Sequence, residues 1–135
     1  MSKIKCSYLG DFNCEAIHLQ SGNQIKTDAP LDHCGKGENF SPTDLLATSL
    51  GTCLLTIMAI KAKSNGWELG NIYLNIEKIM TENKERKIKK LRIEIYIPEN
   101  LSQDKFNFLK NASKDCPVTR NLSESLDIQI IWHYQ

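Results

Sequence analysis

A long run of apolar residues that opens on a helix N-cap constrains the fold of this chain more than any other feature. Ser41-Pro42-Thr43-Asp44 supplies a capping serine, a proline at the first helical position and an acid three residues after the cap. Apolar residues then occupy nearly every side of the helix as far as Ile60, and Gly66 is a natural stop. We therefore expect a central helix that is buried on all sides.

The segments on both sides of this helix alternate apolar and polar residues, as strands do. Residues 4–8, 12–19 and 24–27 have this pattern before the helix, and an irregular loop covers Ala29 to Phe40. After the helix we expect two strands from alternation at 72–76 and 91–97, an amphipathic helix near 101–112 with Ser102 as its cap, a short helix from Pro117 to about Leu126, and a last strand over Asp127–Tyr134. Strands segregated from helices in this way predict an α+β fold.

Length and charge limit the classes of protein to consider. The chain of 135 residues fits a single domain, 1–135. Seventeen basic residues against sixteen acidic ones favour neither nucleic acid nor an anionic membrane as partner, and we interpret the basic cluster at 84–90 as a solvated hairpin end. No targeting segment is visible, and the apolar stretch from Leu50 to Ile60 is too short to span a bilayer. We expect a cytoplasmic protein.

Five cysteines are an odd number, which argues against a disulfide scaffold. Cys6 and Cys14 fall in strand patterns, where a free cysteine behaves as a small buried hydrophobe. Cys34 lies beside His33 in the irregular loop, so a functional role there is left open. A metal site built from Cys14, His18, His33 and Cys34 matches no standard zinc spacing, and we expect neither a metal nor a cofactor.

Cys53 lies within the apolar helix. At 3.6 residues per turn, Leu46, Leu50, Ile57 and Ile60 fall within roughly 60° of it around the helix axis. Burial in such a stripe raises the pKa of a thiol and makes it inert. Periodicity alone therefore indicates a core cysteine at this position.

Cys116 has the opposite local setting. It immediately precedes Pro117, which places it at the N-cap of the short helix that follows. Unpaired amide N–H groups and the positive helix end both favour a thiolate there. Arg120, one turn further on, adds positive potential. The local sequence therefore predicts a reactive thiol at Cys116.

The two cysteine segments together resemble the OsmC/Ohr family, named for osmotically inducible protein C and organic hydroperoxide resistance. The first segment, Asn39 to Cys53, is a proline-started helix rich in small residues, with Gly51 just before the thiol. The second is Cys116-Pro117-Val118 ahead of a short helix. The resemblance covers the order of elements over essentially the whole chain. It implies an OsmC-like fold of antiparallel sheets packed on the buried central helix, and an intertwined homodimer with each active site at the subunit interface.

The resemblance also implies a function. Cys53 would be the peroxidatic thiol and Cys116 the resolving thiol of a peroxidase that reduces organic hydroperoxides. The Cys53 thiolate would attack the O–O bond and become a sulfenic acid, and Cys116 would condense with it to a disulfide that an external dithiol reduces. An apolar pocket around Cys53 suits organic hydroperoxides better than hydrogen peroxide.

One departure from the family pattern keeps a second interpretation open. Peroxidases of the family carry a glutamate ten residues before the first cysteine and pair it with an arginine, whereas this chain has Thr43 at that position and Asp44 next to it. Its arginines are Arg86, Arg92 and Arg120. The chain therefore resembles the OsmC-like branch of the family. The alternative function is a non-peroxidase dimer that binds an apolar small molecule or carries a sulfur or acyl group on Cys53. In a third interpretation the thiols only pack.

Overall fold

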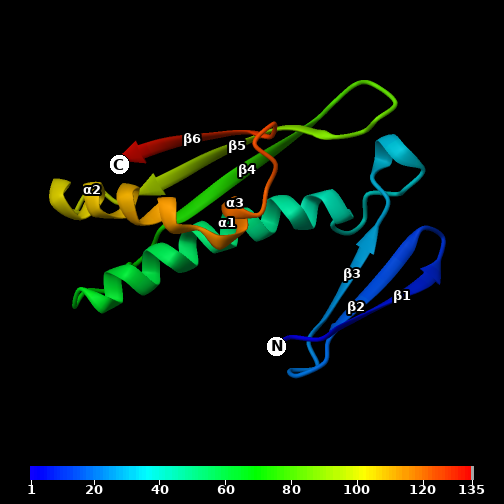
Figure 1. Ribbon diagram of the computed structural model, residues 1–135, viewed down its shortest axis with the longest axis horizontal. Coiled ribbons are helices and arrows are strands. Elements are labelled where there is room, and N and C mark those ends of the chain that lie inside the picture. Colours follow the sequence, from blue (N-terminus) through cyan, green and yellow to red (C-terminus); the bar gives the residue numbers. More distant parts are fainter. Residues whose placement is uncertain (135) are drawn as a thin grey trace. The chain divides into compact units, whose positions relative to one another are not determined.

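The computed structural model describes residues 1–134 and divides into two compact units (Figure 1). The first unit covers Met1–Leu46 and the second begins at Ala47. Both contain strands and helical segments, so the predicted α+β class is confirmed. The prediction of a single domain over 1–135 stays a prediction, as does the intertwined homodimer.

The first unit is built on a three-stranded antiparallel sheet in the order β1-β2-β3. Asp11 and Phe12 form the turn between the first two strands, and both have a left-handed backbone with φ of 52° and 62°. Such a pair matches the twist of a two-residue hairpin. The strands are β1 Ile4–Gly10, β2 Asn13–His18 and β3 Gln24–Asp28.

The loop after β3 is organised by a buried carboxylate. Asp28 is only 2% exposed, and its Oδ2 accepts hydrogen bonds from the backbone N–H groups of Lys36 (3.2 Å) and Glu38 (3.3 Å). The loop passes so close to itself that a Cβ on Gly35 would lie 1.4 Å from the carbonyl oxygen of Ala29. Only glycine is compatible with this approach. The irregular segment of the sequence is therefore an ordered loop, with a 3-10 turn η1 at Leu31–His33.

Helix α1, Pro42–Ser64, begins as its sequence predicts. Asp44 Oδ2 accepts from the Ser41 backbone N–H (2.9 Å), and the Asp44 N–H donates to Ser41 Oγ (3.1 Å). This reciprocal pair is a capping box, which satisfies two N–H groups at the start of the helix. The predicted N-cap is confirmed.

The second unit packs α1 and the later helices against a sheet in the order β4-β5-β6, visible side by side in Figure 1. One feature differs from the expected antiparallel sheets, because β6 runs parallel to β5. The chain leaves β5, crosses through the helices and re-enters the sheet at the starting end of β5, which makes the two strands parallel. The elements are β4 Tyr73–Met80, β5 Ile88–Ile97, α2 Gln103–Ala112 capped by Ser102, η2 Ser113–Asp115, α3 Pro117–Arg120 and β6 Asp127–Tyr134. Helix α3 ends at Arg120, short of the expected Leu126.

The core of the second unit lies between α1, α2 and the inner face of this sheet. Leu50, Leu54 and Met58 of α1 are fully buried there. Gly51 allows a close approach, because a Cβ at this position would lie 2.5 Å from Ile76 Cδ1 on β4. The expectation of burial on all sides is wrong for this chain, since Ile60 is 57% exposed. A single sheet covers only one face of a helix.

Helix α1 is both long and strongly apolar, and one of its faces is not covered by the sheet. Among the described helices, α1 is long and apolar enough to cross a membrane by those two criteria alone. The core helix of a soluble domain passes the same test, and the inner face of α1 is packed against β-strands. Packing in the core of the second unit therefore accounts for the apolar inner face of α1.

Candidate active site

Cys53 lies in the middle of α1, at the edge of an apolar pocket. Cys53 immediately precedes the buried Leu54 and points partly away from the core. Its side chain is therefore half-buried. The pocket has a volume of about 390 Å³ and is open to one side. Its walls come from α1 and from the start of α3, namely Ser49, Thr52, Cys53, Thr56, Ile57, Ile60, Pro117 and Val118.

Cys116 occupies the predicted N-cap position of α3. Its side chain is 0% exposed, and Sγ accepts a hydrogen bond from the Thr119 backbone N–H at 3.5 Å. Pro117 follows at the first helical position. The predicted N-cap placement of Cys116 is confirmed, including the amide donor that it requires. Its reactivity stays a prediction.

The structure brings the two thiols together. Cys53 and Cys116 share a side-chain hydrogen bond, although they are far apart in the sequence. Cys34, Cys6 and Cys14 belong to the first unit, where Cys6 and Cys34 are exposed and Cys14 is half-buried. The expectation that Cys6 is a buried hydrophobe is therefore wrong, because its strand lies at the edge of a small sheet.

The environment shifts the two thiols in opposite directions. Burial raises the pKa of Cys53, and its hydrogen bond with Cys116 raises it further. Burial also opposes ionisation of Cys116, yet its pKa is lowered by the Cys53 thiol, the Thr119 hydroxyl and the backbone N–H groups of Thr119 and Val118. The two thiols therefore titrate together, and Cys116 loses its proton before Cys53 does.

Sequence reasoning missed Thr119. Its hydroxyl and its backbone N–H both stabilise the Cys116 thiolate. Thr119 lies three residues after the N-cap, where a polar side chain can reach back to the capping residue. The sequence therefore carried the signal in the spacing Cys116-Pro117-Val118-Thr119.

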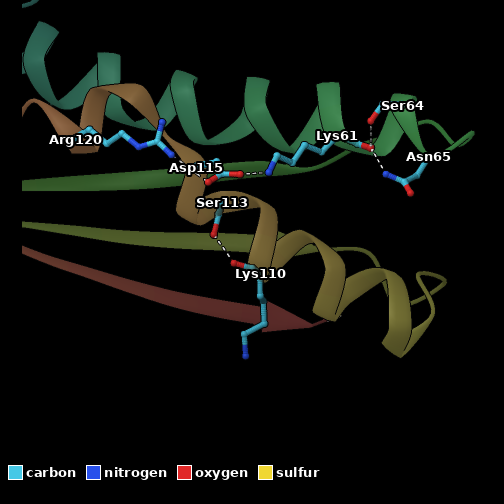
Figure 2. Close-up of polar contacts among 7 residues, drawn as sticks. All are labelled: Lys61, Ser64, Asn65, Lys110, Ser113, Asp115 and Arg120. Carbon is cyan, nitrogen blue, oxygen red and sulfur yellow. Dashed lines mark hydrogen bonds and ion pairs between the residues drawn. The ribbon is translucent and has the colours of Figure 1, made fainter.

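Arg120 has a different role from the one expected. Its guanidinium donates to Asp115 Oδ1 at 3.2 Å, and Lys61 of α1 donates to the other oxygen of the same carboxylate (Figure 2). Lys61 and then Arg120 lower the pKa of Asp115. The positive charge of Arg120 is thus shared with an acid next to Cys116, and is not directed at the thiol alone.

Metal chemistry receives no support from the cysteine and histidine pattern. Within residues 1–134, no three or more His, Cys, Asp or Glu side chains group as metal ligands would. Cys14, His18, His33 and Cys34 are accordingly not gathered into such a site. His18 instead bonds Ser21 Oγ through Nδ1 at 2.6 Å. Cys34 follows η1 with a left-handed backbone of φ 71°.

Comparison with known proteins gives the family. The sequence profile described as OsmC-like protein matches residues 35–131, which include both cysteine segments. The chain belongs to the OsmC-like family. A proposed osmotic stress induced and detoxification response protein from Psychrobacter arcticus 273-4 is 39% identical, with a TM-score of 0.90, over 98% of this chain and 96% of that one. No curated protein sequence matches the chain.

More distant solved structures share the fold of this OsmC-like protein. An organic hydroperoxide resistance protein OsmC from Legionella pneumophila is 16% identical, with a TM-score of 0.77, covering 98% of this chain and 96% of that one. OhrB of Bacillus subtilis, an organic hydroperoxide resistance protein, is 15% identical, with a TM-score of 0.71, covering 98% and 97%. The OsmC/Ohr resemblance of the sequence is confirmed.

The start of α1 lacks the glutamate that the family resemblance leads us to expect as the partner of an activating arginine. Thr43 stands where the resemblance leads us to expect a glutamate, and the adjacent Asp44 carboxylate accepts the Ser41 N–H in the capping box. Asp44 thus has a structural use at the start of α1. Within the second unit, the described groups that stabilise a thiolate at the pair are those around Cys116.

The shared proton leads to a prediction for single replacements. We expect Cys53→Ala to raise the pKa of Cys116, because the thiol hydrogen bond that stabilises its thiolate is lost. The thiolate should then form at higher pH. Titration of the ultraviolet thiolate absorbance, with Cys6, Cys14 and Cys34 replaced by alanine, measures this shift. Cys53→Ser keeps a hydroxyl donor and should restore much of the lowering; equal values for all three proteins would contradict the hydrogen bond.

Proposed function

We propose that this OsmC-like protein is a thiol-dependent peroxidase that reduces organic hydroperoxides through Cys53 and Cys116. The observation that carries the proposal is that the Cys53 and Cys116 side chains pack together and interact electrostatically, with Cys53 at the edge of an apolar pocket. Two cysteines whose side chains pack together are placed to form a disulfide once one of them is oxidised. Membership of a family that includes hydroperoxide resistance proteins supports the same reaction.

The accessibility of the two sulfur atoms supports their separate roles. Cys53 lines the pocket, so a peroxide bound there can meet its Sγ. Cys116 is 0% exposed, and its side chain packs in the same cluster as Cys53 and interacts with it. Cys53 is therefore the attacking thiol of the proposal and Cys116 the resolving thiol.

The shared proton gives a route to activation that needs no arginine. Cys116 ionises before Cys53, so the Cys116 thiolate can accept the proton of Cys53 as Cys53 attacks. Attack on the O–O bond leaves a sulfenic acid on Cys53 and releases the alkoxide, which takes up that proton. Cys116, again a thiolate, then attacks the sulfenic sulfur, and the departing hydroxide takes a proton from solvent and leaves as water. The balance is one hydroperoxide and two thiols converted to an alcohol, water and a disulfide.

The pocket lining supports an organic substrate. Ile57, Ile60, Pro117 and Val118 present apolar surface beside the thiol. The hydroxyl of Thr52 donates to the Thr48 carbonyl oxygen (2.8 Å), so the helix backbone uses it. An alkyl or aryl hydroperoxide buries apolar area in this pocket, which hydrogen peroxide cannot do.

The proposal includes a homodimer, an external dithiol reductant and a cytoplasmic setting, in a response to oxidative stress. The described chain leaves many large apolar side chains exposed, which is unusual for a monomer and would be covered by a second copy. In the first unit these are Met1, Ile4, Tyr8, Leu9, Phe12, Leu19, Ile25, Leu31, Phe40 and Leu46. No metal, cofactor, nucleic acid or membrane takes part in the proposed reaction.

Mass spectrometry of the reduced protein tests the proposal directly. After one equivalent of cumene hydroperoxide we expect a disulfide between Cys53 and Cys116 within one chain, because these two side chains already pack together and interact. Cys116→Ser is the matched control. It should accumulate a sulfenic acid on Cys53 that dimedone traps. Oxidation that falls on Cys6 or Cys34 while Cys53 stays reduced would reject the proposed roles.

The raised pKa of Cys53 favours a second candidate function. A neutral thiol in an apolar pocket fits a dimer that binds an apolar small molecule or carries a sulfur or acyl group on Cys53. This candidate predicts that both thiols stay reduced under one equivalent of peroxide, while an apolar ligand slows alkylation of Cys53. The same mass spectrometry therefore separates the two functions.

A further inference from the structure

An ion-pair bridge joins the segments that carry the two thiols. Asp115 immediately precedes Cys116, and its carboxylate lies between Lys61 and Arg120 (Figure 2). Lys61 belongs to α1, eight residues after Cys53, which is about 12 Å along the helix axis. The bridge therefore ties the turn before Cys116 to the helix that carries Cys53.

The bridge is too exposed to contribute much to global stability. The side chains of Lys61, Asp115 and Arg120 are 34%, 47% and 65% exposed, and ion pairs of this kind contribute little to folding. Its position is what matters. Asp115 is the last residue of the 3-10 turn η2 and is bonded to Cys116, so its bridge to Lys61 restrains the backbone next to Cys116. Lys61 also lowers the pKa of Asp115, which keeps the carboxylate charged.

We propose that Asp115 is a positioning residue, whose bridge to Lys61 holds Cys116 Sγ within reach of Cys53 Sγ and so sets how readily the two thiols close to a disulfide. The inference rests on the proposed function only in that the disulfide is the intermediate of that reaction. When the bridge holds Cys116 near Cys53, the effective concentration of one thiol at the other is high. When the bridge is broken, this effective concentration falls.

Closure can be followed without any peroxide. When oxidised glutathione is the oxidant, the two thiols lose two protons and two electrons, and one glutathione disulfide becomes two glutathione thiols. The equilibrium constant of this exchange measures the effective concentration of the pair. We expect Asp115→Asn and Lys61→Met each to lower this constant by about threefold to tenfold, because both break the same bridge.

A purely electrostatic role makes a different prediction. Removing the carboxylate would leave positive charge near the thiols and favour the thiolate, whereas removing Lys61 would disfavour it. Because the thiolate belongs to the reduced state, Asp115→Asn would then destabilise the disulfide and Lys61→Met would stabilise it. If Asp115→Asn and Lys61→Met change the exchange constant in opposite directions, the positioning role of Asp115 is wrong. It is also wrong if neither variant changes the constant.

The test is a glutathione redox titration of the full chain, read by alkylation and mass spectrometry of Cys53 and Cys116. The double variant Asp115→Asn/Lys61→Met should match either single variant, because one bridge is lost in all three. Additive losses would contradict the bridge. Lys63→Met, on the same helix outside the bridge, should leave the constant unchanged, and circular dichroism checks that each variant is folded. If the exchange constant depends on the bridge but the unsubstituted protein reduces no peroxide, the proposed function is rejected and this inference is supported.

Discussion

Replacing Cys53 with serine is expected to abolish the dithiol-dependent reduction of cumene hydroperoxide. The rate should fall by at least about a thousandfold, because a serine hydroxyl is not ionised near neutral pH and cannot attack the O–O bond as a thiolate does. The pocket and the fold should persist, since serine is close to cysteine in size. The measurement is peroxide consumption in the presence of dithiothreitol.

Two controls make this result specific to the thiol pair. Cys34→Ser alters an exposed thiol of the first unit and should leave turnover unchanged. Without dithiothreitol, Cys116→Ser should consume one equivalent of hydroperoxide and then stop with Cys53 as a sulfenic acid, because no resolving thiol is present. Turnover that survives in Cys53→Ser would exclude Cys53 as the attacking thiol and favour the binding or carrier function.

The second large effect is expected on stability, from Leu54→Ala. Leu54 is 1% exposed and belongs to the cluster between α1 and the sheet β4-β5-β6. Truncation removes buried apolar area and leaves a cavity, so the free energy of unfolding should fall by about 2–5 kcal/mol. Chemical denaturation followed by circular dichroism measures the loss.

Lys63→Ala is the matched control for this prediction. Lys63 is exposed on the same helix, so the free energy of unfolding should change by no more than about 0.5 kcal/mol. A comparable loss for both variants would show that the effect comes from the helix itself and not from the core. A loss below about 1 kcal/mol for Leu54→Ala would contradict its burial.

The pKa of Cys53 is raised and that of Cys116 is lowered, so the two thiols have different roles in proton transfer. The apolar stripe around Cys53 predicts a raised pKa, and the N-cap position of Cys116 predicts a lowered one; both directions are found. In other two-thiol sites a charged side chain can activate the attacking thiol directly. Here the contact between the thiols makes the resolving cysteine the proton acceptor in the proposed reaction.

The strands and helices could largely be predicted from the sequence because their signals are local. Alternation of apolar residues located β5, and the capping residues located the starts of α1 and α2. The parallel pairing of β5 with β6 was not predictable in this way. It depends on the path of the chain between the two strands, and no periodicity within either strand records that path.

The central helix illustrates the same division. Its sequence by itself determined that the segment from Pro42 onward is helical, apolar and capped, because each of these properties depends on residues within a few positions of each other. It could not determine which faces are covered, since burial depends on what packs against the helix. Only the tertiary structure decided that Leu54 faces the core, that Cys53 faces a pocket, and that Cys116 reaches Cys53 from a distant turn. Contacts between residues far apart in the chain decide which of five cysteines form a pair.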